Sequence, residues 1–241
     1  MPLYTADALV LRTYKLAEAD RIVVFLTRDR GKKRGVAKGA RRPRSRFTGA
    51  LEPLTEVRVA YFEKEGRELV GLNYAETVHS PLRACGRLPS LSAGSGRGDG
   101  HAATDAEVAR EGDALGYVGY FAELLDEWAQ DADADDRLYR LGASMLDALG
   151  TDAPLEPLAR YFEYWLLRLQ GVYPEARGSL STGAVAFLAA SRTLPPHRVG
   201  EARAEGRVLD ELRTTHRALI AMHLEKTLKS DRVLRDLRRH A

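Results

Sequence analysis

The stretch LTEVRVAYF, residues 54–62, sets the fold class of the N-terminal region. Val57, Val59 and Tyr61 recur with a period of two, which is typical of a strand. Working outward, similar short apolar or β-branched runs separated by turn residues occur at residues 5–13, 21–27, 33–38 and 68–78. Several short strands within about 80 residues predict a small barrel, and a five-stranded oligonucleotide-binding (OB) barrel is one natural solution. Pattern alone does not separate it from other small β folds.

A basic segment interrupts these strands. Between Arg30 and Arg46 the chain carries nine basic residues and no acidic one, whereas the net charge of the whole chain is only +3. Arginine can donate two hydrogen bonds to a phosphate, and lysine supplies a point charge. This concentration of cations favours binding to nucleic acid over a merely solvated loop.

The middle of the basic segment predicts an irregular backbone. Residues 39–49 (GARRPRSRFTG) contain two glycines and Pro43, so we expect a mobile loop between strands. Phe47 in this loop and Tyr61 in the next strand would suit stacking on bases. Most strand aromatics pack inward, however, and we expect both rings in the core.

The second half of the chain has a different pattern. Residues 85–104 (CGRLPSLSAGSGRGDGHAAT) predict a flexible linker and not a phosphate-binding loop. From Asp105 onward apolar residues recur at intervals of three and four, which predicts helices. Expected helices include residues 138–149, 182–190, 209–228 and 231–239, and a strongly apolar one opens at Pro154 and Pro157. We divide the chain into a barrel domain (1–80), a linker (81–106) and a helical domain (107–241), an α+β organisation.

Several classes of function have no support in the sequence. The single cysteine, Cys85, excludes an intramolecular disulfide and a thiol-rich metal site. His216 and His223 have no third ligand at a suitable spacing, so we expect structural roles and no metal or cofactor. No nucleophile motif or carboxylate pair indicates an enzyme. No apolar run approaches the roughly 20 residues of a membrane helix, and no secretory signal is present, which fits a cytoplasmic protein.

The residues around the basic segment resemble a known family. GKKRGVAKGARRPRSRFTGALEPLTEV (31–57) is similar to the signature of the bacterial RecO family of recombination mediators, and so is ALVLRTYKLAEADRIVVFLT (8–27). The resemblance continues through GYFAELL (119–125), ARYFEYWLLRLQGVYP (159–174) and LEKTLKSDRVLRDL (224–237). It covers nearly the whole chain except the linker.

The resemblance implies an OB barrel followed by a helical domain, binding to single- and double-stranded DNA, and annealing of complementary strands. It also implies partnership with RecR and with the acidic C-terminal tail of the single-stranded DNA-binding protein, which together load the recombinase without nucleotide hydrolysis. Arg160, in the stretch matching R-x-F-E-x-x-L-L, is implied to contact the acidic end of that tail. The positions that match the family's DNA-binding motif are Lys32, Arg34, Lys38, Arg41, Arg42 and Arg44.

Three features depart from the family pattern. Many members carry two C-x-x-C pairs that form a zinc knuckle after the tyrosine–proline step. Here residues 171–188 (GVYPEARGSLSTGAVAFL) contain no cysteine, so we expect the knuckle segment to be deleted with its metal. Asp231 occupies a position that is often basic in the family, which weakens the case for a phosphate contact there. The long linker looks inserted, so we expect a looser orientation of the barrel relative to the helices.

Two other functions stay open. The chain could be an interaction module whose basic loop binds RNA or an acidic protein tail. It could also be a nuclease, although no credible carboxylate cluster accompanies the basic loop. We expect a monomer, since no long coiled coil or apolar edge stands out, and a cytoplasmic, nucleoid-associated location.

Overall fold

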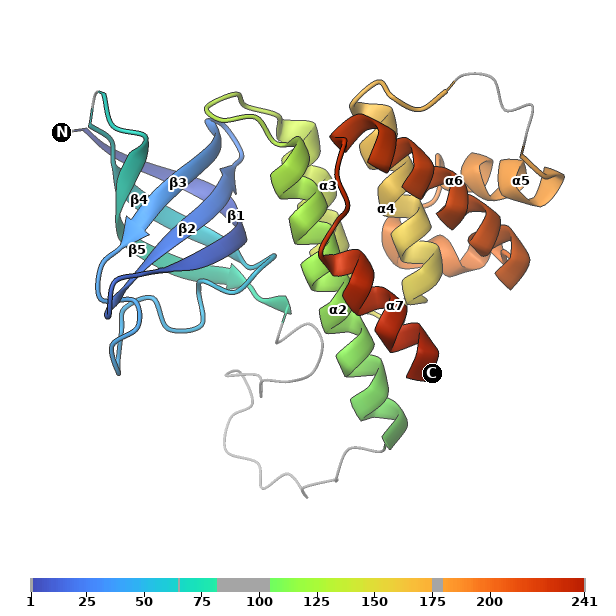
Figure 1. The fold of residues 1–241 in the computed structure, drawn as a ribbon, viewed down its shortest axis with the longest axis horizontal. Helices are drawn as coiled ribbons and strands as arrows, with labels where there is room; N and C mark the ends of the chain where they lie inside the picture. Colours follow the sequence, from blue (N-terminus) through green and yellow to red (C-terminus); the bar gives the residue numbers. More distant parts are fainter. Residues whose placement is uncertain (1, 65, 82–104, 175–179, 241) are drawn as a thin grey trace.

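The computed structural model describes residues 2–64, 66–81, 105–174 and 180–240. A β-barrel comes first and a group of helices follows (Figure 1), which confirms the predicted α+β class. The strands are β1 (Leu3–Leu16), β2 (Asp20–Thr27), β3 (Gly31–Ala37), β4 (Glu56–Phe62) and β5 (Leu69–His79). The helical elements are α2 (Asp105–Trp128), α3 (Asp136–Leu149), α4 (Leu155–Leu169), α5 (Thr182–Ala190), the 3-10 helix η1 (Pro196–Ala202), α6 (Gly206–Leu224) and α7 (Ser230–His240). The predicted linker lies almost entirely outside the described residues.

The five strands close into a barrel in the order β1-β2-β3-β5-β4. β1 is the longest strand, and it closes the barrel by pairing with both β2 and β4. All pairs are antiparallel except β3 with β5, which run parallel through Arg34–Leu69 and Val36–Gly71. A closed five-stranded barrel of this kind is the OB architecture predicted from the sequence.

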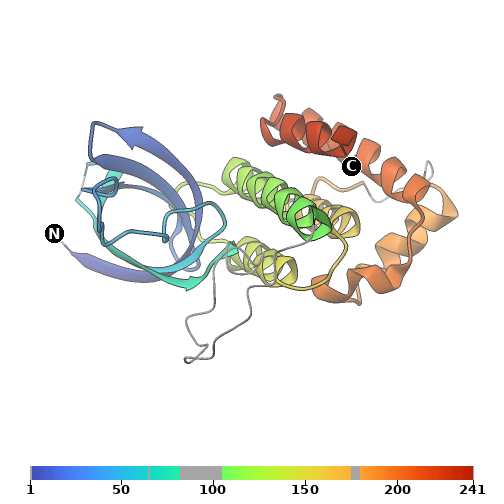
Figure 2. The same ribbon diagram turned by 90° about the horizontal axis from the view of Figure 1, so that it is seen from below.

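Two barrel strands are buried on both faces. Ala8 and Val10 of β1 point into the barrel core, whereas Leu9 and Leu11 point outward and join the core of the helices. β2 behaves in the same way, and other barrel residues in the helical core are Val24, Leu26 and Leu54. Figure 2 shows α2 and α3 side by side between the barrel and the remaining helices. The expected loose orientation is therefore wrong, because the barrel and the helices share one hydrophobic core.

A backbone contact reinforces this junction at the start of β3. The Lys32 N–H donates to the Gln130 carbonyl at 3.1 Å, and the Ala132 N–H donates to the Lys32 carbonyl at 3.1 Å. Gly31 makes the close approach possible: its φ is +68°, and a Cβ there would lie 2.3 Å from the Asp133 carbonyl oxygen. Only glycine fits both conditions without strain.

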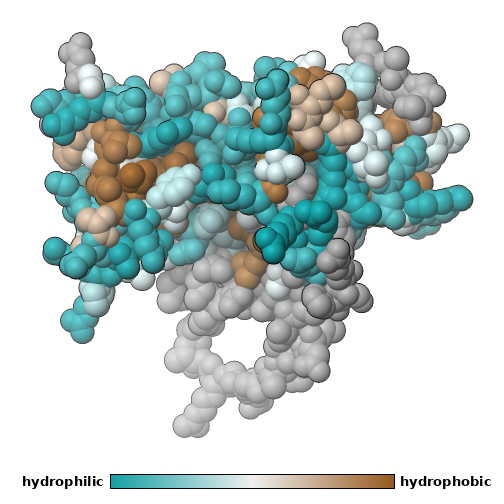
Figure 3. All heavy atoms as spheres, viewed as in Figure 1, coloured by the Kyte–Doolittle hydropathy of each residue, from teal (hydrophilic) through white to brown (hydrophobic). Residues whose placement is uncertain are grey.

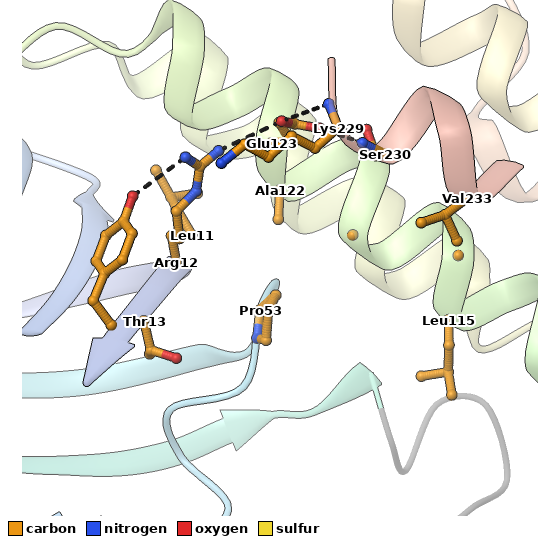
Figure 4. Close-up of a pocket in the computed structure, with 13 residues that line it drawn as sticks. Leu11, Arg12, Thr13, Pro53, Leu115, Ala122, Glu123, Lys229, Ser230 and Val233 are labelled. Atoms are coloured by element: carbon orange, nitrogen blue, oxygen red, sulfur yellow. Dashed lines mark hydrogen bonds and ion pairs between the residues drawn. The ribbon is translucent and has the colours of Figure 1, made fainter. Parts of the chain in front are cut away.

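Charged side chains line the same junction. Arg12 of β1 reaches α2, with ion-pair distances of 3.8 Å to Glu123, 3.2 Å to Asp126 and 3.7 Å to Glu127. In Figure 4 the Arg12 guanidinium and the start of α7 meet at Glu123, above a hollow of about 420 Å³ between β1, α2 and α7. The acidic row of α2 thus neutralises Arg12 within the protein.

Glu123 also holds α7 in place. Its carboxylate accepts hydrogen bonds from the Lys229 N–H (3.0 Å), just before that helix, and from the N–H of its first residue, Ser230 (2.8 Å). Burial alone would raise the pKa of Glu123, but these bonds, the Ser230 hydroxyl and the charge of Arg12 hold the pKa below its usual range. A carboxylate that accepts the unpaired N–H groups of a helix start stabilises that start.

The helices follow the predicted pattern closely. Asp135 caps α3 by accepting hydrogen bonds from Arg137 N–H and Leu138 N–H, both at 3.0 Å. α5 has the predicted bounds. α6 ends at Leu224, four residues before the predicted Leu228, and Glu225 with φ +52° caps it. η1 was not predicted. Within the described ranges, no helix combines the length and the apolar character needed to cross a membrane.

A buried polar network joins α4 to α2 and α6. Arg160 pairs with Glu163 at 2.8 Å, and the Tyr120 hydroxyl donates to the same carboxylate at 2.6 Å. His216 Nδ1 lies 3.0 Å from the other Glu163 oxygen, and Tyr173 lies 3.3 Å from His216 Nε2. Burial alone would raise the pKa of Glu163, but Arg160, His216 and Tyr120 hold it below its usual range.

We predict that Gly31→Ala lowers the free energy of unfolding by about 3 kcal/mol, because the left-handed backbone and the collision with Asp133 both add to the cost. Gly49→Ala is the matched control, since Gly49 has φ +76° but nothing within 4 Å of an added Cβ. It should cost about 1 kcal/mol. Urea denaturation of both variants measures the difference, and equal losses would contradict a tight junction at Gly31.

We predict that Glu163→Gln costs about 3–5 kcal/mol of stability, because it leaves the buried Arg160 charge without its partner. Glu201→Gln provides the control. Glu201 forms the same i,i+3 pair with Arg198, but on the exposed surface, and should change stability little. A similar, small effect of both changes on the denaturation midpoint would show that the network is not structural.

Candidate nucleic-acid interface

The basic loop, defined here as residues 38–46, leaves the barrel between β3 and β4 as a series of turns. Its irregular backbone is as predicted, but the loop is anchored at several points. The Gly39 N–H donates to Asp20 Oδ1 at 2.8 Å, and the Arg41 N–H donates to the Ala19 carbonyl at 2.9 Å. Phe47, directly after the loop, is only 2% exposed and packs in the barrel core. The barrel therefore sets the position of the loop.

Four of the predicted DNA-binding cations project from this loop. Lys38, Arg42 and Arg44 are exposed, and no carboxylate in the described part of the chain lies within ion-pairing distance of them. Arg41 is also exposed, and its guanidinium donates to the Ala17 and Glu18 carbonyls at 3.2 and 2.8 Å. These carbonyls orient the Arg41 side chain without neutralising its charge. The loop therefore presents a cluster of uncompensated positive charges.

The two predicted cations on β3 have different surroundings. The Arg34 side chain is 53% exposed, with one long ion pair of 3.9 Å to Asp131. Lys32 is only 11% exposed, and its Nζ donates to the Asp126 carbonyl at 2.7 Å and lies 3.6 Å from the Asp126 carboxylate. Lys32 thus joins the barrel to α2 and is not presented to a ligand, which corrects the role expected for it. Its neighbour Arg34 remains accessible.

Phe47 and Tyr61, the two aromatic residues considered for base stacking, lie inside the barrel. Tyr61 is fully buried and contacts Phe25 edge-on at a ring separation of 5.7 Å. Burial raises the pKa of Tyr61 to about 12, so the phenol is neutral at physiological pH. With Phe47 also buried, the expectation that both rings belong to the core is confirmed.

Arg160 does not lie where a peptide could reach it. Its side chain is 3% exposed and belongs to the buried network around Glu163. The two histidines considered as ligands also have structural contacts: His216 in that network, and His223 stacked on Trp128 with a ring separation of 5.4 Å. No group of three or more potential metal ligands occurs among the described residues. The i,i+3 spacing of Arg160 and Glu163 was the sequence signal for this internal pair.

Two cations outside the basic segment were missed. Lys64 and Arg67 are exposed in the connection between β4 and β5, and with Lys38 they line a hollow of about 560 Å³ on the barrel. In the space-filling view, apolar residues gather over β3, β4 and β5, and hydrophilic residues surround them (Figure 3). Gly71 within a predicted strand was only a partial signal: a glycine leaves no side chain to fill the surface, but the residues around it follow from the register of three strands.

Family models match both parts of the chain. The model described as "Recombination protein O N terminal" matches residues 1–81, and the model described as "Recombination protein O C terminal" matches residues 109–190. The two matched segments correspond to the barrel and to most of the helical region, in the same order.

Individual relatives agree with these models. The chain is 36% identical over 170 residues to DNA repair protein RecO of Koribacter versatilis, covering 70% of this chain and 59% of the relative. It is 35% identical over 184 residues to DNA repair protein RecO of Desulforudis audaxviator, covering 76% and 63%. The match to DNA repair protein RecO of Bifidobacterium adolescentis is 56% over 78 residues, or 32% of this chain and 31% of the relative.

The matched part spans no more than 63% of the length of the first two relatives. The closed barrel, the helices that follow it and the two family models in that order lead to one conclusion. This chain belongs to the recombination protein O (RecO) family.

Proposed function

We propose that this chain is a DNA repair and recombination mediator that binds single- and double-stranded DNA and anneals complementary strands. The observation that carries the proposal is the basic loop, whose exposed cations Lys38, Arg41, Arg42 and Arg44 have no carboxylate partner among the described residues. Arg34 extends the cluster along β3. Phosphate contacts of this kind bind any sequence, because they do not read base edges.

Annealing follows from the same electrostatics. Two single strands repel each other because each carries one negative charge per nucleotide. Cations that neutralise phosphates on both strands lower this repulsion and allow base pairs to form. No nucleotide hydrolysis or bond cleavage is needed, so we propose a non-enzymatic role without a cofactor.

The helical region is the proposed docking part for proteins. The helical region would contact RecR and the acidic C-terminal tail of the single-stranded DNA-binding protein, and would so help to load the recombinase. Arg160 would support the tail site indirectly, since it holds α4 against α2 and α6 through Glu163. We propose a monomer that acts in the cytoplasm at the nucleoid.

We predict that DNA affinity falls steeply with salt. If the loop and Arg34 make about four to five phosphate contacts, a plot of log affinity against log salt concentration should have a slope of about −4 on duplex DNA and about −3 on a single strand. Fluorescence anisotropy with a labelled oligonucleotide gives this slope. A slope close to zero would contradict phosphate binding, and a preference for RNA over DNA in competition would favour an RNA-binding module.

We predict that Arg41→Glu with Arg42→Glu abolishes the acceleration of strand annealing and weakens binding to all sequences alike. The assay pairs two complementary oligonucleotides, one coated with the cognate single-stranded DNA-binding protein. Arg42→Glu with Arg44→Glu tests the same cluster without removing the hydrogen bonds of Arg41 to Ala17 and Glu18.

Arg203→Glu with Arg207→Glu is the matched control. It changes the net charge equally, and both residues are exposed in the helical region. If this control reduces annealing as much as the loop variants do, net charge and not the loop is responsible. If only some sequences lose affinity in the loop variants, the loop reads bases.

A further inference from the structure

A glycine leaves a hollow in the outer face of the barrel. In the register of the sheet, Gly71 of β5 lies directly between Val36 of β3 and Phe62 of β4. Residues opposite each other in a sheet point to the same face. The neighbours of Gly71 along the strand, Val70 and Leu72, are buried, so this row faces outward. A Cβ at Gly71 would have nothing within 4 Å, which leaves open space between the Val36 and Phe62 side chains.

The walls of this hollow are apolar and its rim is cationic. Leu69, two residues before Gly71 on the same face, is 37% exposed and lines the hollow with Val36 and Phe62. The rim carries three cations and one carboxylate, namely Lys38, Lys64, Arg67 and Glu68. Among the described residues none of these three cations has an ion pair with a carboxylate. The hollow therefore suits a flat, weakly polar group that is attached to negative charges.

An unpaired nucleotide has that combination of properties. Its base is a flat ring that stacks on aromatic and apolar side chains, and its phosphate is an anion. A paired base cannot enter in the same way, because it first has to leave the stack of the duplex. Lys38 belongs both to this rim and to the basic loop, so the hollow adjoins the loop that is proposed to hold the strand.

We propose that the hollow over Gly71 binds an unpaired nucleobase, with Phe62, Val36 and Leu69 against the ring and Lys64 and Arg67 on the flanking phosphates. This inference rests on the proposed DNA binding and deepens it, because it gives the barrel a means to distinguish single strands from duplex. The loop supplies affinity for any phosphate backbone, and the hollow supplies the preference for unpaired bases.

Gly71→Val tests the proposal by filling the hollow. The position is compatible with a side chain, since Gly71 has no positive φ, has free space for a Cβ and lies in a strand, where valine is favoured. Thr77→Val is the matched control, because Thr77 is exposed on the same strand but does not line the hollow. Leu69→Ala removes an exposed side chain from the wall of the hollow and replaces Gly71→Val as the test if that variant does not fold. Circular dichroism and thermal unfolding establish that each variant is folded.

The probes are oligothymidylate, an oligonucleotide of the same length made of abasic sites, and a duplex. The wild type should bind oligothymidylate about tenfold more tightly than the abasic strand, as expected for one stacked base. Gly71→Val should lose that preference and leave duplex affinity unchanged, whereas Thr77→Val should behave like the wild type.

If both Gly71→Val and Leu69→Ala still prefer oligothymidylate to the abasic strand, the proposal that the hollow binds a base is overturned. DNA binding by the loop would be unaffected by that result. Equal losses for all three probes also overturn it, because filling the hollow would then act on the backbone contacts. If the wild type binds none of the probes, the proposed DNA binding is wrong, and the base-binding role of the hollow is wrong with it.

Discussion

The burial of β1 and β2 on both faces is the constraint on which the rest of the structure depends. Leu9 and Leu11 leave the barrel core and enter the core of the helices, while Ala8 and Val10 fill the barrel between them. Two-sided burial explains why residues 8–11 of β1 and residues 22–26 of β2 are continuous apolar runs and not alternating ones. It also fixes the orientation of the barrel, since any rotation would expose one of these sets to water.

This arrangement decides which cations are available to a ligand. One side of the barrel is occupied by α2 and α3, so cations that reach it meet the acidic row of α2, as Arg12 and Lys32 do. Among the described residues, Leu69 and Gly71 of β5 are exposed to solvent instead, together with the basic loop. Basic residues that are adjacent in sequence are thereby divided between a structural and an exposed set. The positive charge that is concentrated in one segment of the sequence is therefore also concentrated on one surface of the folded protein.

Local pattern was sufficient for the strands and α-helices, though not for η1, and it was not sufficient for the contacts between them. Period-two and period-three-to-four repeats predicted the strands and helices, because burial of one face imposes these periods. The role of Lys32 depends on where α2 docks, and no local pattern encodes that position. The burial of Arg160 does not follow from its i,i+3 spacing to Glu163, because Tyr120 and His216, which complete the network around Glu163, come from distant parts of the chain. The hollow at Gly71 depends on register across three strands, which a single sequence does not show.

The anchoring of the basic loop has a thermodynamic consequence. Arg41 is held by the carbonyls of Ala17 and Glu18, and Phe47 fastens the end of the loop in the barrel core. The loop therefore loses most of its conformational entropy when the barrel folds. When a phosphate backbone binds, the loop backbone and the Arg41 side chain are already ordered, so less binding energy is spent on ordering them. Preorganisation of this kind lets a short cluster of arginines act as a defined surface and not as a diffuse cationic tail.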